Sequence, residues 1–111
     1  MAGLACGEVS ELGWEILKTG TDALVAIDDA WAVEGVRSLA HPAAGDMAVV
    51  SGETGATGLA ALLAVQDKPA MLRTLVLDTS SCVLLLGSEG DTDPEIYARI
   101  VGRSAEEVLA A

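Results

Sequence analysis

Aromatic side chains are almost absent from this chain. It has no Phe, one Tyr and two Trp, although 51% of its residues are hydrophobic. The core must therefore be built from Ala, Val, Leu and Ile, a composition that suits buried parallel strands covered by helices. Intrinsic disorder is excluded, because it combines a high net charge with low hydrophobicity.

Basic side chains are also scarce. Six Lys and Arg residues stand against 17 Asp and Glu residues, which gives a formal net charge of −11. Proteins hold phosphate backbones mainly through Lys and Arg, so we expect no nucleic-acid partner. The charge indicates an acidic, solvated surface.

Cysteine pairs and long apolar runs are missing as well. Cys6 and Cys82 form no CxxC pair, which argues against a zinc site or a disulfide framework. Cys82 opens an apolar run, and we expect it to be a buried core thiol. No run approaches the roughly 20 apolar residues that span a bilayer, and the first residues do not resemble a signal peptide. We therefore expect a cytoplasmic protein with no membrane partner.

The pattern along the chain predicts a single α/β domain over residues 1–111. Helices are expected after Ser10, after Asp28 or Asp29, after the Gly-rich stretch 51–58, from Pro69, from Pro94 and after Ser104. Short apolar runs predict strands at 22–27, 47–50 and 82–87. This alternation indicates a partial three-layer parallel sheet with helices on both faces. Three strands make a thin sheet, which suggests part of a larger domain.

The first candidate site is "SGETGATG", residues 51–58, between an expected strand and an expected helix. In doubly wound α/β proteins such turns lie at the carboxyl end of the sheet, where ligands bind. No Lys follows the last Gly, so the stretch is not a Walker loop. A ligand-binding turn and a tight turn without a ligand both fit these residues.

The second candidate site is "GSEGDT", residues 87–92, after the strongest expected strand. Glu89, Asp91 and Asp93 could supply hard oxygen ligands to Ca²⁺ or Mg²⁺, but the spacing of an EF-hand is not continued. Asp91, Thr92 or Asp93 more simply caps the helix that follows, where acidic charge is favoured. We therefore expect no metal site.

Three stretches resemble one known enzyme family. "MAGLACGEVSELGWEIL", "VVSGETGATGLAALL" and "VLLLGSEGDTDPEIYARIVGRSAEEV" are similar, in this order, to the C-terminal part of diaminopropionate ammonia-lyase. This family belongs to the pyridoxal-phosphate (PLP) enzymes of fold type II, the tryptophan-synthase-β-like group. The "SEGDTDP" block is fairly specific to the family, whereas "SGETGA" is shared in looser form by dehydratase-like relatives. The resemblance implies roughly the last quarter to third of such an enzyme.

The resemblance also implies how PLP is held. Ser88 should present a neutral hydroxyl to the pyridine nitrogen, which makes the ring a milder electron sink than a carboxylate would. Glu53 should lie near the ring, Gly52 and Gly55 should leave room for it, and "GLACGE", residues 3–8, should face the substrate. The lysine that holds the cofactor's aldehyde and the glycine loop that grips its phosphate belong to the N-terminal part of the family. Neither Lys18 nor Lys68 lies in a matching motif, so we expect no catalytic residue here.

The implied reaction of the complete enzyme is β-elimination of 2,3-diaminopropionate to pyruvate and ammonia. The expected partners are a small amino-acid substrate and the missing N-terminal part, and the complete enzyme should be a homodimer. Alone, the chain should be inactive. Two alternatives stay open: a segment of a threonine- or serine-dehydratase-like PLP lyase, and a non-catalytic relic or partner-completing subunit whose sheet edge docks another chain.

Overall fold

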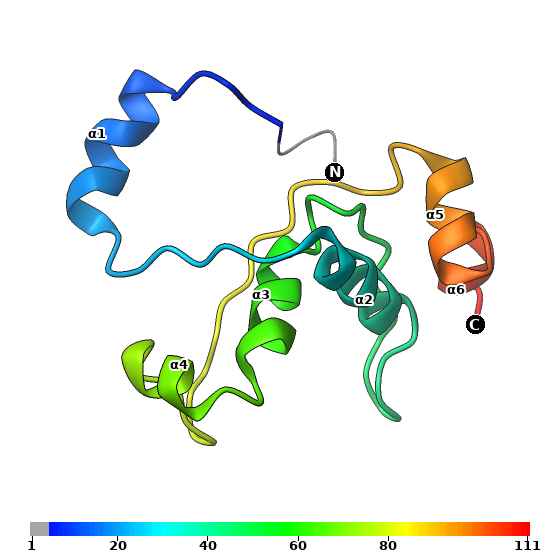
Figure 1. Ribbon diagram of the computed structural model, residues 1–111. Coiled ribbons are helices and arrows are strands. Elements are labelled where there is room, and N and C mark those ends of the chain that lie inside the picture. Colours follow the sequence, from blue (N-terminus) through cyan, green and yellow to red (C-terminus); the bar gives the residue numbers. More distant parts are fainter. Residues whose placement is uncertain (1–4) are drawn as a thin grey trace.

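Residues 5–111 are described by a computed structural model and form six α-helices joined by turns and extended segments (Figure 1). Each helix lies where the sequence predicts one. Their bounds are α1 Glu11–Gly20, α2 Asp29–Ala40, α3 Thr57–Val65, α4 Pro69–Thr74, α5 Pro94–Val101 and α6 Ala105–Leu109.

Local capping determines where the last two helices begin. The Asp93 side chain accepts a hydrogen bond from the Ile96 backbone N–H at 3.0 Å, and Pro94 occupies the first turn of α5. At α6, the Ser104 hydroxyl accepts from the Glu107 N–H at 3.2 Å, while the Glu107 carboxylate accepts from the Ser104 N–H at 2.8 Å. Both caps satisfy N–H groups that a helix leaves free, and both confirm the sequence prediction.

The predicted parallel sheet is wrong. No strand occurs within residues 5–111, and no backbone hydrogen bond joins the segments 22–27, 47–50 and 82–87 to one another. An apolar run indicates that a segment is suited to burial, but a strand exists only where a neighbour supplies hydrogen-bond partners. The three segments are kept apart here, so the three-layer α/β arrangement is replaced by a helical one.

The segment 82–87 is extended but pairs with no neighbouring strand among the described residues. Leu84 and Leu86 are each 84% exposed, whereas Val83 and Leu85 are 47% and 39% exposed. This alternation is typical of an extended segment that packs one face against α3. Figure 1 shows the segment running beside that helix. Cys82 is exposed, so the prediction of a buried thiol is also wrong.

The core forms where α2 crosses α3 at close range. Ala32 and Ala60 are fully buried, and a Cβ placed on Gly35 would lie 3.0 Å from the Ala56 carbonyl oxygen. Small side chains at the crossing allow the two backbones to approach. The core then continues onto α5 and α6 through Val36, Ala40, Ala56, Tyr97, Val101 and Val108.

Helix α1 lies away from this core. The Ser10 hydroxyl accepts from the Gly13 N–H at 3.2 Å and caps the helix, yet none of its residues is buried (Figure 1). Leu12 is 79% exposed and Ile16 is 68% exposed.

Within the described chain, no helix combines the length and the apolar character that a membrane span requires.

Candidate functional site

Two glycine-rich turns, far apart in the sequence, meet at the N-terminal end of α3. The Gly52 backbone N–H donates to the Glu89 carbonyl oxygen at 3.1 Å. Ser51 is buried, and its hydroxyl is shared between two acceptors. It donates to the carbonyl oxygens of Gly52, at 3.1 Å, and Glu89, at 3.3 Å. The stretches 51–58 and 87–92, which the sequence predicts as two separate candidate sites, therefore form one site.

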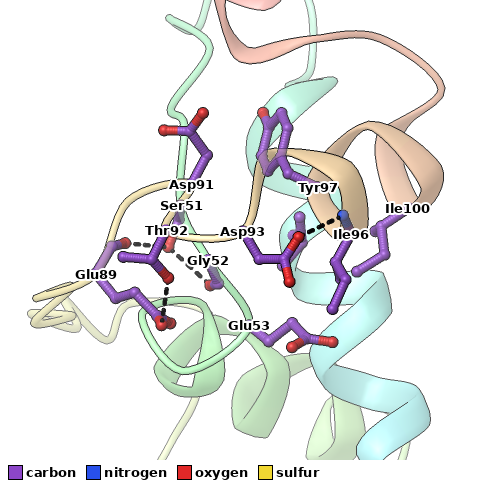
Figure 2. A pocket seen from close by; sticks show the side chains of 11 residues that line it. Ser51, Gly52, Glu53, Glu89, Asp91, Thr92, Asp93, Ile96, Tyr97 and Ile100 are labelled. Atoms are coloured by element: carbon purple, nitrogen blue, oxygen red, sulfur yellow. Dashed lines mark hydrogen bonds between the residues drawn. The ribbon is translucent and has the colours of Figure 1, made fainter. Parts of the chain in front are cut away.

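The Glu89 side chain completes the junction between the turns. Its Oε2 atom accepts from the backbone N–H groups of Thr54, at 2.8 Å, and Gly55, at 3.3 Å, and its Oε1 atom accepts from the Thr92 hydroxyl at 3.1 Å (Figure 2 shows the last of these). Burial alone would raise the pKa of this carboxyl. The hydrogen bonds from Thr92, Thr54 and Gly55 outweigh burial, and the pKa of Glu89 lies below its ordinary value.

Glycine at positions 52 and 55 is explained by this contact. A Cβ on Gly52 would lie 2.5 Å from the Gly90 carbonyl oxygen and 2.6 Å from the Glu89 carboxylate. A Cβ on Gly55 would lie 2.6 Å from the Glu89 carbonyl oxygen and 2.6 Å from the Ser51 hydroxyl oxygen. The space that these glycines leave open is already used by residues 89 and 90, and their predicted role in making room for a cofactor ring stays a prediction.

A small pocket lies between the two turns and α5 (Figure 2). Its volume is about 30 Å³, which is room for about one water molecule and too little for a pyridine ring. Glu53, Glu89, Asp91, Asp93 and Tyr97 are among the residues that line it.

Tyr97 is the only aromatic residue among those that line this pocket. Its hydroxyl is buried and has no hydrogen-bond partner within the described part of the chain. Burial raises the pKa of Tyr97, the negative charge of Asp91 raises it further, and the positive charge of Arg103 opposes them. The composition of the sequence identifies Tyr97 as its only tyrosine, but the buried hydroxyl appears only in the structure.

Hydrogen bonds to the end of α5 hold this helix against α2. Arg37 Nε donates to the Ile100 carbonyl oxygen at 3.0 Å, and His41 Nε2 lies 3.2 Å from the Val101 carbonyl oxygen. Arg103 approaches His41 Nδ1 at 2.9 Å. A guanidinium can only donate, so His41 accepts at Nδ1 and donates from Nε2. These contacts fix the wall of the pocket that α5 supplies.

The predicted site residues are brought together around the two turns. Gly52 and Gly55 lie at their contact, and Glu53 lines the pocket from the first turn (Figure 2). Ser88 is exposed, and its hydroxyl has no hydrogen-bond partner among residues 5–111. Sequence patterns indicate no role for Ser51 and offer Glu89 only as a possible metal ligand. The fold alone identifies the partners of both residues.

Other predicted features can also be placed. Residues 3 and 4 of "GLACGE" lie outside the described residues, whereas Cys6 and Glu8 are exposed before α1. Lys18 is paired with Glu15 at 2.7 Å on exposed α1, and Lys68 precedes α4. Across residues 5–111 no cluster of side chains is suited to a metal ion, and Asp93 caps a helix as expected.

Comparison with known proteins identifies the class. The chain is homologous to a segment of an amino-acid lyase of which a PLP complex has been solved. That relative is diaminopropionate ammonia-lyase. The protein from Escherichia coli K12 is 41% identical over 104 residues, and that from Salmonella typhimurium LT2 is 42% identical over 111 residues. The predicted resemblance is confirmed. No family model matches the chain.

The solved structures agree with the sequence comparison. The Escherichia coli enzyme in complex with D-serine superimposes with a TM-score of 0.86 at 40% identity, over 95% of this chain. The same enzyme with an aminoacrylate–PLP azomethine intermediate also gives a TM-score of 0.86, over 91% of this chain. The matches cover 26–28% of the relatives, so the chain spans about a quarter of their length, as the resemblance implied.

Proposed function

We propose that this chain is the segment of a diaminopropionate ammonia-lyase that lies beneath the cofactor ring, and that it acts only together with the rest of such an enzyme. The observation that carries the proposal is the fold. At 40% identity, the chain adopts the conformation that the matching segment has in the enzyme solved with a PLP intermediate. The proposed reaction is β-elimination of 2,3-diaminopropionate to pyruvate and ammonia.

We propose that Glu53 and Ser88, which lies outside the small pocket between the turns, meet one end of PLP. The exposed hydroxyl of Ser88, which has no hydrogen-bond partner among residues 5–111, can donate to a pyridine nitrogen without placing a charge there. Glu53 lies in the neighbouring turn, where its carboxylate can lie beside the ring. When bound, PLP supplies an electron sink for the charge left at the substrate's Cα after its proton is lost. With the neutral Ser88 hydroxyl as its partner, the ring would be a weaker electron sink than with a carboxylate.

The remaining parts of the enzyme are proposed to come from a partner segment. Lys18 and Lys68 lie on α1 and beside α4, away from the two turns, so the chain has no lysine at the proposed cofactor site. Leu84 and Leu86 are apolar side chains that the described residues leave exposed. We propose that the completing segment covers them, that the complete enzyme is a homodimer, and that it works in the cytoplasm.

The test compares the chain with a complete enzyme built around it. In a chimaera, these 111 residues replace the matched segment of the Escherichia coli relative. We expect the chimaera to show the visible absorption of bound PLP and to release pyruvate and ammonia from 2,3-diaminopropionate, whereas the isolated chain does neither. Pyruvate release by the isolated chain would overturn the requirement for a partner.

The choice of substrate separates the proposed activity from the alternatives. Serine and threonine are assayed beside 2,3-diaminopropionate, with the keto acid measured in each case. A chimaera that eliminates only from serine or threonine would indicate a dehydratase-like lyase. A folded chimaera that binds no PLP would indicate a non-catalytic segment.

A further inference from the structure

Within residues 5–111, the Ser88 side chain makes no hydrogen bond that would hold it in place. Its hydroxyl is exposed. Its position is therefore determined by its neighbours along the backbone. Gly87 packs against the first turn, where a Cβ would lie 3.5 Å from the Gly55 carbonyl oxygen, and Glu89 is hydrogen-bonded to that turn through both its backbone and its side chain.

Glu89 uses all its oxygen atoms in this contact. Its carbonyl oxygen accepts from Gly52 and Ser51, Oε2 accepts from Thr54 and Gly55, and Oε1 accepts from Thr92. Hydrogen bonds to an ionised carboxylate are stronger than neutral ones, and four of these five partners belong to the other turn.

The same contacts argue against a catalytic role for this carboxylate. A general base needs a free oxygen within reach of the proton that it removes. Both carboxylate oxygens of Glu89 already accept hydrogen bonds, and these favour the ionised form. The side chain is thus built to hold a position rather than to exchange protons.

We infer that Glu89 is a positioning residue that holds Ser88 against the 51–58 turn and thereby sets where the serine hydroxyl meets the cofactor ring. The inference rests on the proposed function for the identity of the ring. The contact between the two turns is a property of this chain alone. The contact and its effect on Ser88 at the cofactor ring can therefore be tested separately.

The first test measures amide hydrogen exchange at Thr54 and Gly55 in the full chain. Glu89→Gln keeps the size of the side chain but removes the charge, and we expect exchange at both amides to become about tenfold faster. Glu95→Gln is the matched control, because it removes the same charge from an exposed residue six positions along the chain. Equal exchange in the two variants would overturn the contact.

The second test asks whether Glu89 acts through Ser88. In the chimaera, we expect Glu89→Gln to lower kcat about tenfold with little change in KM, and to shift the pH profile of the PLP absorption as Ser88→Ala does. If the two residues act as one unit, adding Glu89→Gln to Ser88→Ala has almost no further effect. Independent effects that multiply would overturn the inference.

The outcomes also separate the inference from the proposed function. A chimaera that binds PLP, carries a Glu89-dependent absorption and releases no pyruvate refutes the proposed reaction and supports the positioning role. A chimaera that is fully active with both Glu89→Gln and Glu95→Gln refutes the positioning role and supports the proposed reaction.

Discussion

Replacing Gly52 by Ala should strongly weaken the contact between the two turns. The new Cβ would lie 2.5 Å from the Gly90 carbonyl oxygen and 2.6 Å from the Glu89 carboxylate, both closer than real Cβ contacts. Relief requires the backbone of residues 89 and 90 to move. Forced overpacking of this kind typically costs about 1–3 kcal/mol, and losing the hydrogen bond from the Gly52 N–H adds about 1 kcal/mol. The expected loss in the free energy of unfolding is therefore about 2–4 kcal/mol.

Denaturant unfolding followed by far-ultraviolet circular dichroism measures this loss. Gly90→Ala is the matched control, because it makes the same change in the same contact and a Cβ there would meet nothing within 4 Å. Small domains are stable by only about 5–15 kcal/mol, so the two variants should differ clearly in their midpoints. If Gly52→Ala were as stable as Gly90→Ala, the packing of the two turns described above would be wrong.

Three further outcomes follow from the same structure. Asp93→Ala should lower the free energy of unfolding by about 1 kcal/mol through loss of the α5 cap, whereas Glu95→Ala, which removes no cap, should not; denaturant unfolding of both variants checks this. The pKa of Tyr97 is raised above its ordinary 10.0, so this side chain loses its proton first in the unfolded state. The free energy of unfolding should therefore fall as pH rises above about 10, and Tyr97→Phe should lack this fall. The pKa of Glu89 is lowered from 4.5, so its contribution is present above that pH and is lost as pH falls through the folded-state value; acid unfolding of Glu89→Gln should lack this component.

Local features were predictable from the sequence because their causes are local. The caps at Asp93 and Ser104 join residues three positions apart, and the structure contains both. An acidic residue of the run after Ser88 was expected to cap the following helix, and Asp93 does so. The family resemblance was also readable, because it rests on blocks of adjacent residues.

The errors concern segments whose structure depends on distant partners. The run 82–87 has the composition of a buried strand, yet Leu84 and Leu86 are exposed and Cys82 is not buried. Apolar composition measures how favourable burial would be, but it does not supply the neighbouring strand that burial and backbone pairing require. The predicted sheet failed for this reason.

By itself, the sequence determined the six helices, the caps at Ser10, Asp93 and Ser104, the acidic surface and the kinship with diaminopropionate ammonia-lyase. The expected cap of α2 by Asp28 makes no side-chain hydrogen bond. Only the tertiary structure decided that Glu89 bonds to amides 34 and 35 residues away, and that Gly52 and Gly55 are needed for this contact. Hydrogen bonds and steric contacts act over a few ångströms of space. Residues so distant in the chain become neighbours only after α2, α3 and α5 have packed together.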